Sequence, residues 1–215
     1  MGNLRRVVGF FALGLVVANS QGCAFLTALA RTGGAAPAPR QIRPTSASSF
    51  NVLCVVPRSI VIDSEMLSPG EIEAAKAAIV EINRVIPGLL VLVGEVSHRE
   101  AVASVEKGLT AFTAPPERVD EDTIAVTLLT ARKICIDGTP IIYLSPKDKF
   151  SQADVNQVML HELMHSLGYN HHDGDSPISS VMRPGLSSEH RVGLSKADEN
   201  SLKSVYGDSL PLPLL

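Results

Sequence analysis

Residues 161–173 constrain this chain more than any other segment: they read HELMHSLGYNHHD and contain four of its six histidines. The apolar residues before and within this segment recur with helical spacing, which predicts a buried helix that ends at Gly168. On such a helix His161 and His165 lie one turn apart on the same face. Both imidazoles can therefore bind one metal ion at about 2.0–2.1 Å.

Three further residues of this segment complete a candidate metal site. Glu162 lies beside the histidine pair, where a carboxylate can take a proton from a water at the metal. Gly168 can adopt a positive φ and reverse the chain, so that His171 returns to supply a third nitrogen. Three protein ligands leave a fourth position for water, as in catalytic zinc sites, whereas structural sites close with four protein ligands. The alternative is a solvated, histidine-rich helix end.

HELMHSLGYNH is similar to the long zinc motif of the metzincin metallopeptidases, His-Glu-x-x-His-x-x-Gly-x-x-His. Downstream, SSVMRPG offers Met182 for the Met-containing turn that metzincins have beneath the zinc. The segment LSKADENSLKSVYG resembles the C-terminal helix of the matrixins, the matrix-metallopeptidase branch. The resemblance covers roughly residues 58 to 207.

The resemblance implies a zinc-dependent endopeptidase that acts on protein or peptide substrates with one catalytic Zn²⁺. It assigns the metal to His161, His165 and His171, catalysis to Glu162, and support of the site to Gly168 and Met182. The chain departs from the matrixin pattern in two ways: Arg183-Pro184 follows the turn methionine in place of Tyr-Pro, and no cysteine-switch propeptide is recognisable. A structural Ca²⁺, which matrixins often bind, could contact residues 173–175, although a polar turn is the other use of such a segment.

The fold expected from these patterns is α/β (α+β), a metzincin-like twisted, mixed, five-stranded sheet. Two helices on the N-terminal side, one of them carrying the zinc motif, and a C-terminal helix accompany it. Capping signals place the helices at about 69–85, 151–167 and 195–206. We expect the later helices on the opposite side of the sheet from the first, and residues 108–122 as a polar loop. RKICID should form a hairpin with PIIYLS across residues 137–138, and as an edge strand it should pair with an extended substrate.

The first 23 residues read as a signal peptide, with MGNLRR as the positive region and VVGFFALGLVVA as the apolar stretch. Cys23 follows Gly22 as in a bacterial lipoprotein cleavage box, but Ser20 replaces the usual Leu. Cleavage after Ser20 with free secretion, or retention of residues 7–30 as a membrane span, are the alternatives to lipid attachment at Cys23. Residues 24–49 are small, polar and Pro-rich, so they read as a flexible tether to a catalytic domain at 50–210.

Composition limits the other partners. The chain has 19 Lys and Arg against 22 Asp and Glu and shows no basic stripe, which argues against nucleic acid as a partner. If Cys23 is consumed by lipid, Cys54 and Cys135 remain as a possible disulfide, with buried free thiols as the alternative. A membrane is expected as a partner only through Cys23, and the oligomeric state is not indicated.

These observations predict a zinc-dependent endopeptidase that hydrolyses peptide bonds through a metal-activated water. It is expected to be exported, either lipid-anchored in the cell envelope or secreted. The alternative is a zinc-binding envelope lipoprotein that has lost catalytic turnover. The intact Glu162 argues against this alternative.

Overall fold

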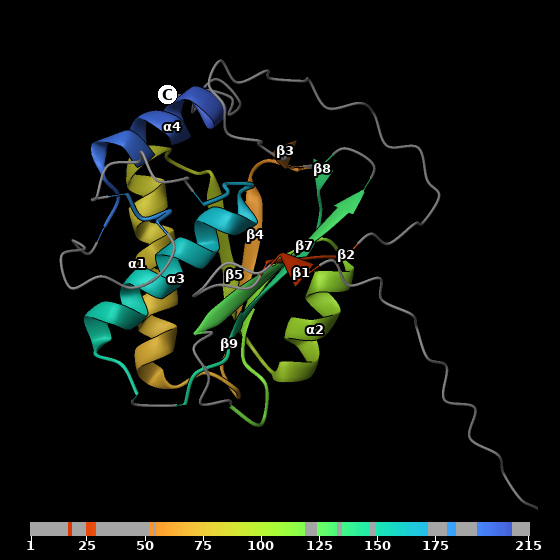
Figure 1. Cartoon of the computed structure of the whole chain (residues 1–215). Helices are drawn as coiled ribbons and strands as arrows, with labels where there is room; N and C mark the ends of the chain where they lie inside the picture. The colour runs from red at the N-terminus through yellow and green to blue at the C-terminus, as the bar shows by residue number, and fades with distance from the viewer. Residues whose placement is uncertain are drawn as a thin grey trace, which may run out of the picture.

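A computed structural model describes residues 17–18, 25–28, 52–53, 55–118, 124–132, 135–146, 149–171, 180–183 and 193–207. Five strands form its central mixed sheet in the order β7-β9-β6-β4-β5 (Figure 1). They are β4 (Arg58–Asp63), β5 (Leu90–Val96), β6 (Thr110–Thr113), β7 (Ala125–Arg132) and β9 (Thr139–Tyr143). Strands β5, β4, β6 and β9 are parallel, while β7 runs antiparallel to β9. The expected mixed, five-stranded sheet is confirmed.

Four short strands extend this sheet: β1 (Val17–Ala18), β2 (Phe25–Ala28), β3 (Val52–Leu53) and β8 (Cys135–Ile136). Strand β2 pairs with β7 in parallel and with β1 in antiparallel orientation. Strand β8 pairs with β3 on one side and antiparallel with β7 on the other.

The pairing of β8 corrects two expectations. RKICID does not form a hairpin with PIIYLS. Its Arg132 is the last residue of β7, and its Cys135–Ile136 (β8) pair back on β7, while β9 pairs with β6 and β7. Gly138 serves a close approach instead of a hairpin turn, because a Cβ there would collide with the backbone carbonyl of Val105 at the end of the neighbouring helix. Since β8 has partners on both sides, Cys135–Ile136 is not an open edge for a substrate strand.

The four helices in the described part of the chain are α1 (Pro69–Val85), α2 (His98–Glu106), α3 (Gln152–Ser166) and α4 (Lys196–Tyr206). Each begins after a serine whose side chain accepts from the amide three residues later, while the acidic side chain at that position accepts from the serine amide. Such caps contribute about 1 kcal/mol each. Helices α1, α3 and α4 match the predicted ones, and α2 was not predicted.

The helices cover the two faces of the sheet unequally. Helices α1 and α3 pack side by side against one face, and α4 crosses near the end of α1 (Figure 1). Helix α2 lies against β4 and β6 on the other face, over a small cluster of Val61, Ala101 and Ala111. The expectation that the later helices oppose the first is therefore wrong. The reason is that α3 is largely buried and α1 is buried along one face, so that each covers the other as well as the sheet.

Strand β6 lies at the centre of the sheet, although residues 108–122 were expected to form a polar loop. All four of its residues are buried. Its two threonines form hydrogen bonds with buried charged side chains. Thr110 Oγ1 accepts a 2.9 Å bond from Arg58 Nε, and Thr113 Oγ1 donates to Asp63 Oδ2 at 2.6 Å. Burial lowers the pKa of Arg58 to about 10. A four-residue strand that contains two threonines shows no alternation of apolar and polar residues by which the sequence could reveal it.

Among the residues that the structure describes, no helix has both the length and the apolar character needed to cross a lipid bilayer.

Candidate metal centre

Three histidines meet at the C-terminal end of α3. His161 and His165 project from adjacent turns of the helix, and 6% and 1% of their surfaces are exposed. Gly168 then adopts a φ of +94°, and the chain reverses to bring His171 back to the helix. The three Nε2 atoms are 3.0 Å (His161 to His165), 3.0 Å (His161 to His171) and 3.1 Å (His165 to His171) apart. The structure thus brings together all three predicted ligands.

The hydrogen bonds of two rings determine which nitrogen faces the centre. His161 Nδ1 lies 2.6 Å from the carbonyl oxygen of Val181, and His165 Nδ1 lies 2.7 Å from that of Tyr169. A carbonyl can only accept, so each Nδ1 carries the proton and each neutral ring turns an Nε2 lone pair to the centre. Two lone pairs 3.0 Å apart repel each other unless a cation lies between them.

This donor set fits zinc. Nitrogens about 3 Å apart can all bond one ion at about 2.0–2.1 Å, and imidazole nitrogen is a preferred zinc ligand. The grouped side chains are three histidines, and zinc sites with three protein ligands are the catalytic kind, which keeps its fourth position for water or substrate. Burial is the main cause that lowers the pKa of His165 well below its usual value, and positive charge on His161 or His171 would lower it further. His165 is therefore neutral at pH 7, as a ligand must be.

Glu162 is fully buried beside the histidines, with its side chain turned toward β7. Its Oε2 lies 2.6 Å from the Oγ1 of Thr127 on that strand. The same hydroxyl is 3.0 Å from the backbone carbonyl oxygen of Glu162. Sequence reasoning missed Thr127, because a single threonine in an apolar strand carries no signal of a partner 35 residues away.

Met182 lies in a turn that spans residues 180–183, and its side chain is fully buried. The turn touches the metal centre through Val181, whose carbonyl accepts from His161. It is held from the other side by Asp198 of α4, which accepts from the Ser180 hydroxyl at 2.7 Å and from the Val181 amide at 3.0 Å. No local pattern in the sequence relates Asp198 to Val181, which lies 17 residues away.

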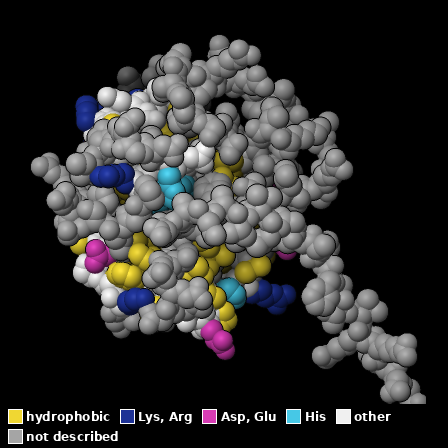
Figure 2. Space-filling view, viewed as in Figure 1, with side chains coloured by type: hydrophobic (Ala, Val, Ile, Leu, Met, Phe, Trp, Pro, Cys, Tyr) yellow, Lys and Arg dark blue, Asp and Glu magenta, His cyan; other side chains and the backbone are white. Residues whose placement is uncertain are grey.

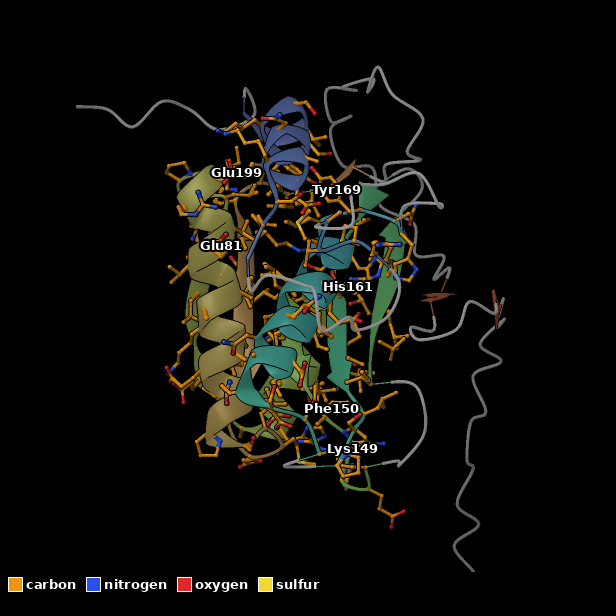
Figure 3. The ribbon with its side chains drawn as sticks, turned by 60° about the vertical axis from the view of Figure 1, so that its left-hand side comes forward. Glu81, Lys149, Phe150, His161, Tyr169 and Glu199 are labelled. Atoms are coloured by element: carbon orange, nitrogen blue, oxygen red, sulfur yellow. The ribbon has the colours of Figure 1, made fainter. Side chains whose placement is uncertain are left out.

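Figure 2 shows histidine side chains (cyan) on the face of the molecule that it views. This agrees with the exposure of His171, which is partly accessible while His161 and His165 are buried. Figure 3 shows His161 on α3 and Tyr169 just beyond the end of that helix.

His98 lies apart from the metal centre and has partners of its own. His98 Nδ1 lies 2.6 Å from Oδ2 of Asp63, a fully buried carboxylate that also accepts from Thr113. This cluster joins the N-terminus of α2 to the ends of β4 and β6 and contains no part of the metal centre. His172, His190, residues 173–175 and Cys54 lie outside the described residues, so the calcium and disulfide predictions stay predictions.

The metal centre combines three local features: a helix with two histidines one turn apart, a glycine turn that returns a third histidine, and a turn with a buried methionine. Together with the mixed five-stranded sheet, this is the three-histidine zinc site and fold of a metzincin metallopeptidase. Residues 105–207 match the family model described as Matrixin. This match and the three-histidine site identify a metzincin-type zinc metalloprotease.

Solved structures that resemble this chain at low sequence identity include a zinc-protease and a metalloproteinase. High choriolytic enzyme 1, a hatching enzyme zinc-protease from Oryzias latipes (medaka fish), is 16% identical, with a TM-score of 0.40 over 70% of this chain and 88% of its own. Myroilysin is 10% identical, with a TM-score of 0.47 over 74% and 82%. Metalloproteinase-II from Bacteroides fragilis is 14% identical, with a TM-score of 0.44 over 75% and 55%. Comparison with curated protein sequences finds no match.

Proposed function

We propose that this metalloendopeptidase uses Glu162 as its general base and that it acts outside the cytoplasm after export. A zinc ion held by His161, His165 and His171 would act as a Lewis acid toward the scissile carbonyl and toward water. The protein's own part in the reaction is to place the substrate, to exclude bulk water and to move one proton.

Glu162 is suited to move that proton. The attacking water gives a proton to the carboxylate as its oxygen bonds to the carbonyl carbon, and the carboxyl group then gives the proton to the nitrogen as the C–N bond breaks. The products are a carboxylic acid and an amine, and Glu162 ends as it began. The observation that carries this proposal is that Glu162 is fully buried next to His161 yet is not one of the grouped metal-ligating side chains.

Substitution of Glu162 by Gln tests the role directly. Glu162→Gln keeps the size and the hydrogen-bonding capacity of the side chain but cannot accept a proton, so zinc should stay at one ion per chain while peptide hydrolysis falls by about 10²-fold or more. Glu100→Gln, on α2 across the sheet, is the matched control and should hydrolyse peptides like the wild type. Wild-type rates in Glu162→Gln would refute the role.

The alternative function, zinc binding without turnover, makes a different prediction for the wild type. A peptide library digested with and without a chelator separates the two. Chelator-sensitive cleavage supports the peptidase, while a zinc-loaded wild-type protein that cleaves no peptide supports the alternative. The library also reports the preferred residues on each side of the cleaved bond.

Export is supported by the apolar run after MGNLRR, and lipid attachment by Gly22-Cys23 with the Pro-rich residues that follow. In a bacterial host, Cys23→Ser should move the protein from the membrane fraction to the soluble fraction. Mass spectrometry of the mature N-terminus decides among the alternatives. A lipid-modified Cys23 supports anchoring, an unmodified N-terminus at Gln21 supports free secretion, and an intact residue 1 refutes cleavage of the signal.

A further inference from the structure

We propose that Thr127 is a positioning residue for Glu162: its hydroxyl holds the carboxylate in the orientation that proton transfer requires. The proposal deepens the function proposed above and rests on Glu162 being the general base. Thr127 itself touches neither the metal ligands nor a site for substrate in the described contacts, so it would act only through Glu162.

The contact has the geometry of a strong hydrogen bond. The 2.6 Å separation between Thr127 Oγ1 and Glu162 Oε2 lies at the short end of the range for a hydroxyl donating to a carboxylate. The hydroxyl has one proton and two acceptors on Glu162, the carboxylate oxygen and the backbone carbonyl oxygen at 3.0 Å. The carboxylate is closer and charged, so it takes the proton.

Thr127 is a rigid anchor. It is 1% exposed, and its position along β7 is set by antiparallel pairing opposite Ile141 of β9. Threonine is branched at Cβ, which restricts χ1 and hence the position of Oγ1. Its bond to the Glu162 carboxylate therefore joins β7 to α3 at this residue.

A glutamate needs such an anchor. Its side chain rotates about three bonds, and a carboxylate that samples several rotamers spends only part of its time aligned with the reacting water. Holding Oε2 against β7 fixes the carboxylate plane and with it the direction of the second oxygen. Displacement of a reacting group by about 1 Å can lower a rate by about 10²-fold.

A merely structural role, in which Thr127 only joins the strand to the helix, is the competing explanation. The chain offers a matched control in Thr113, which is also buried and also places its hydroxyl 2.6 Å from a buried carboxylate oxygen, that of Asp63. Asp63 takes no part in the metal centre. Thr127→Val and Thr113→Val therefore remove the same bond from the same kind of environment, once at the centre and once away from it.

The experiment compares Thr127→Val, Thr127→Ser and Thr113→Val as zinc-loaded, full-length proteins. Thr127→Val should lower kcat by about tenfold or more, with KM within about twofold of the wild type and one zinc per chain retained. Thr127→Ser keeps the hydroxyl and should restore kcat to within about threefold. Thr113→Val should lose thermal stability but keep kcat. If Thr127→Val does not fold, Thr127→Ala against Thr127→Ser provides the same comparison.

A second measurement separates this inference from the role of Glu162. In the Glu162→Gln background Thr127→Val should lower kcat no further, and a crystal structure of metal-free Thr127→Val should show the Glu162 carboxylate turned away from its wild-type orientation. Unchanged kcat in Thr127→Val, or equal losses in Thr127→Val and Thr127→Ser, would overturn the inference. If Glu162→Gln itself kept full turnover, the proposed general base would be wrong instead.

Discussion

The carboxylate of Asp198 on α4 accepts a 3.0 Å hydrogen bond from the backbone amide of Val181, whose carbonyl in turn accepts from the metal-facing His161. Asp198 is 2% exposed and also accepts from the hydroxyls of Ser180 and Ser195. One buried carboxylate thus caps α4, closes the turn that contains Met182, and orients a ligand of the metal through two intervening hydrogen bonds.

This relationship predicts that Asp198→Ala weakens both the fold and the metal site. Loss of a buried carboxylate that accepts several hydrogen bonds leaves their donors unsatisfied, which should cost about 2–4 kcal/mol of unfolding free energy. Zinc affinity, measured by competition with a chromogenic chelator, should fall about tenfold or more because the hydrogen-bonded support of His161 is disturbed.

The neighbouring residue provides the control for this prediction. Glu199 forms exposed ion pairs with Arg84 and Lys196, and Figure 3 shows it on α4 near Glu81 of α1, which also bonds Arg84. Glu199→Gln should change the unfolding free energy by less than about 1 kcal/mol and leave zinc affinity unchanged. An Asp198→Ala variant that binds zinc like the wild type would show that the turn keeps its geometry without α4.

The third ligand can be distinguished from its neighbour by substitution. His171→Ala should lose tight zinc binding, because only two imidazoles then remain, and the melting temperature of the protein in zinc buffer should fall with it. His172→Ala should keep one zinc per chain and change activity modestly. Zinc content of the two purified variants is the measurement, and metal lost from His172→Ala but kept by His171→Ala would reverse the assignment.

The metal-free protein should lose stability in mild acid. The pKa of His165 is lowered in the folded chain, chiefly by burial, below its ordinary value of 6.5. At a pH between the lowered pKa of the folded state and 6.5, the unfolded chain binds a proton at His165 that the folded chain does not. The free energy of unfolding should therefore be full above about pH 6.5 and fall as the pH decreases below it. Thermal melts in chelator from neutral pH downward test this, and a melting temperature that rises on acidification would contradict it.

Bound zinc should protect the fold from this loss of stability when the pH falls below neutrality. Metal binding needs the neutral imidazoles, so bound zinc keeps the three rings unprotonated until protons displace it. The loaded protein should therefore keep its melting temperature to a lower pH than the metal-free protein, and then lose metal and stability together. Equal pH profiles with and without zinc would show that these histidines do not hold the ion.

The three tyrosines of the chain should resist ionisation in the folded state. Burial, with a smaller contribution from the negative charge of Glu71, raises the pKa of Tyr143 to about 12, and burial raises the pKa values of Tyr169 and Tyr206 further. A raised pKa means that stability is full below pH 10 and is lost as the pH rises through 10 toward 12, where the unfolded chain ionises first.

Ultraviolet titration of tyrosinate measures this prediction without interference from tryptophan, which the chain lacks. Little tyrosinate should form in the folded protein near pH 10, and all three tyrosines should ionise together when the protein unfolds in alkali. In urea the same chain should titrate near pH 10. Tyrosinate that forms near pH 10 before the loss of structure would show that these side chains are less buried than described.

Local signals predicted much of the helical structure. Ser68, Ser151 and Ser195 each begin a capping box, and the helices that follow them lie where the pattern places them. Ser97 begins the same box before α2 but was not read as a helix start, because the helix is short and only Ala101 of its residues is buried. Strand β6 is buried, unlike α2, but its threonines break the apolar pattern expected of a central strand, and so it was not predicted.

The ligand set of the metal centre could be read from the sequence because it is local. His161, His165, Gly168 and His171 lie within eleven residues, and the pitch of one helix with one positive-φ turn dictates how they meet. The hydrogen bonds that orient the centre join residues that lie far apart in the sequence. Thr127 reaches Glu162 across 35 residues, Val181 reaches His161 across 20, and Asp198 reaches Val181 across 17. No backbone periodicity relates such positions. They meet because the order of the strands and the shared burial of α1 and α3 place β7 under the metal helix and α4 behind the turn of Met182.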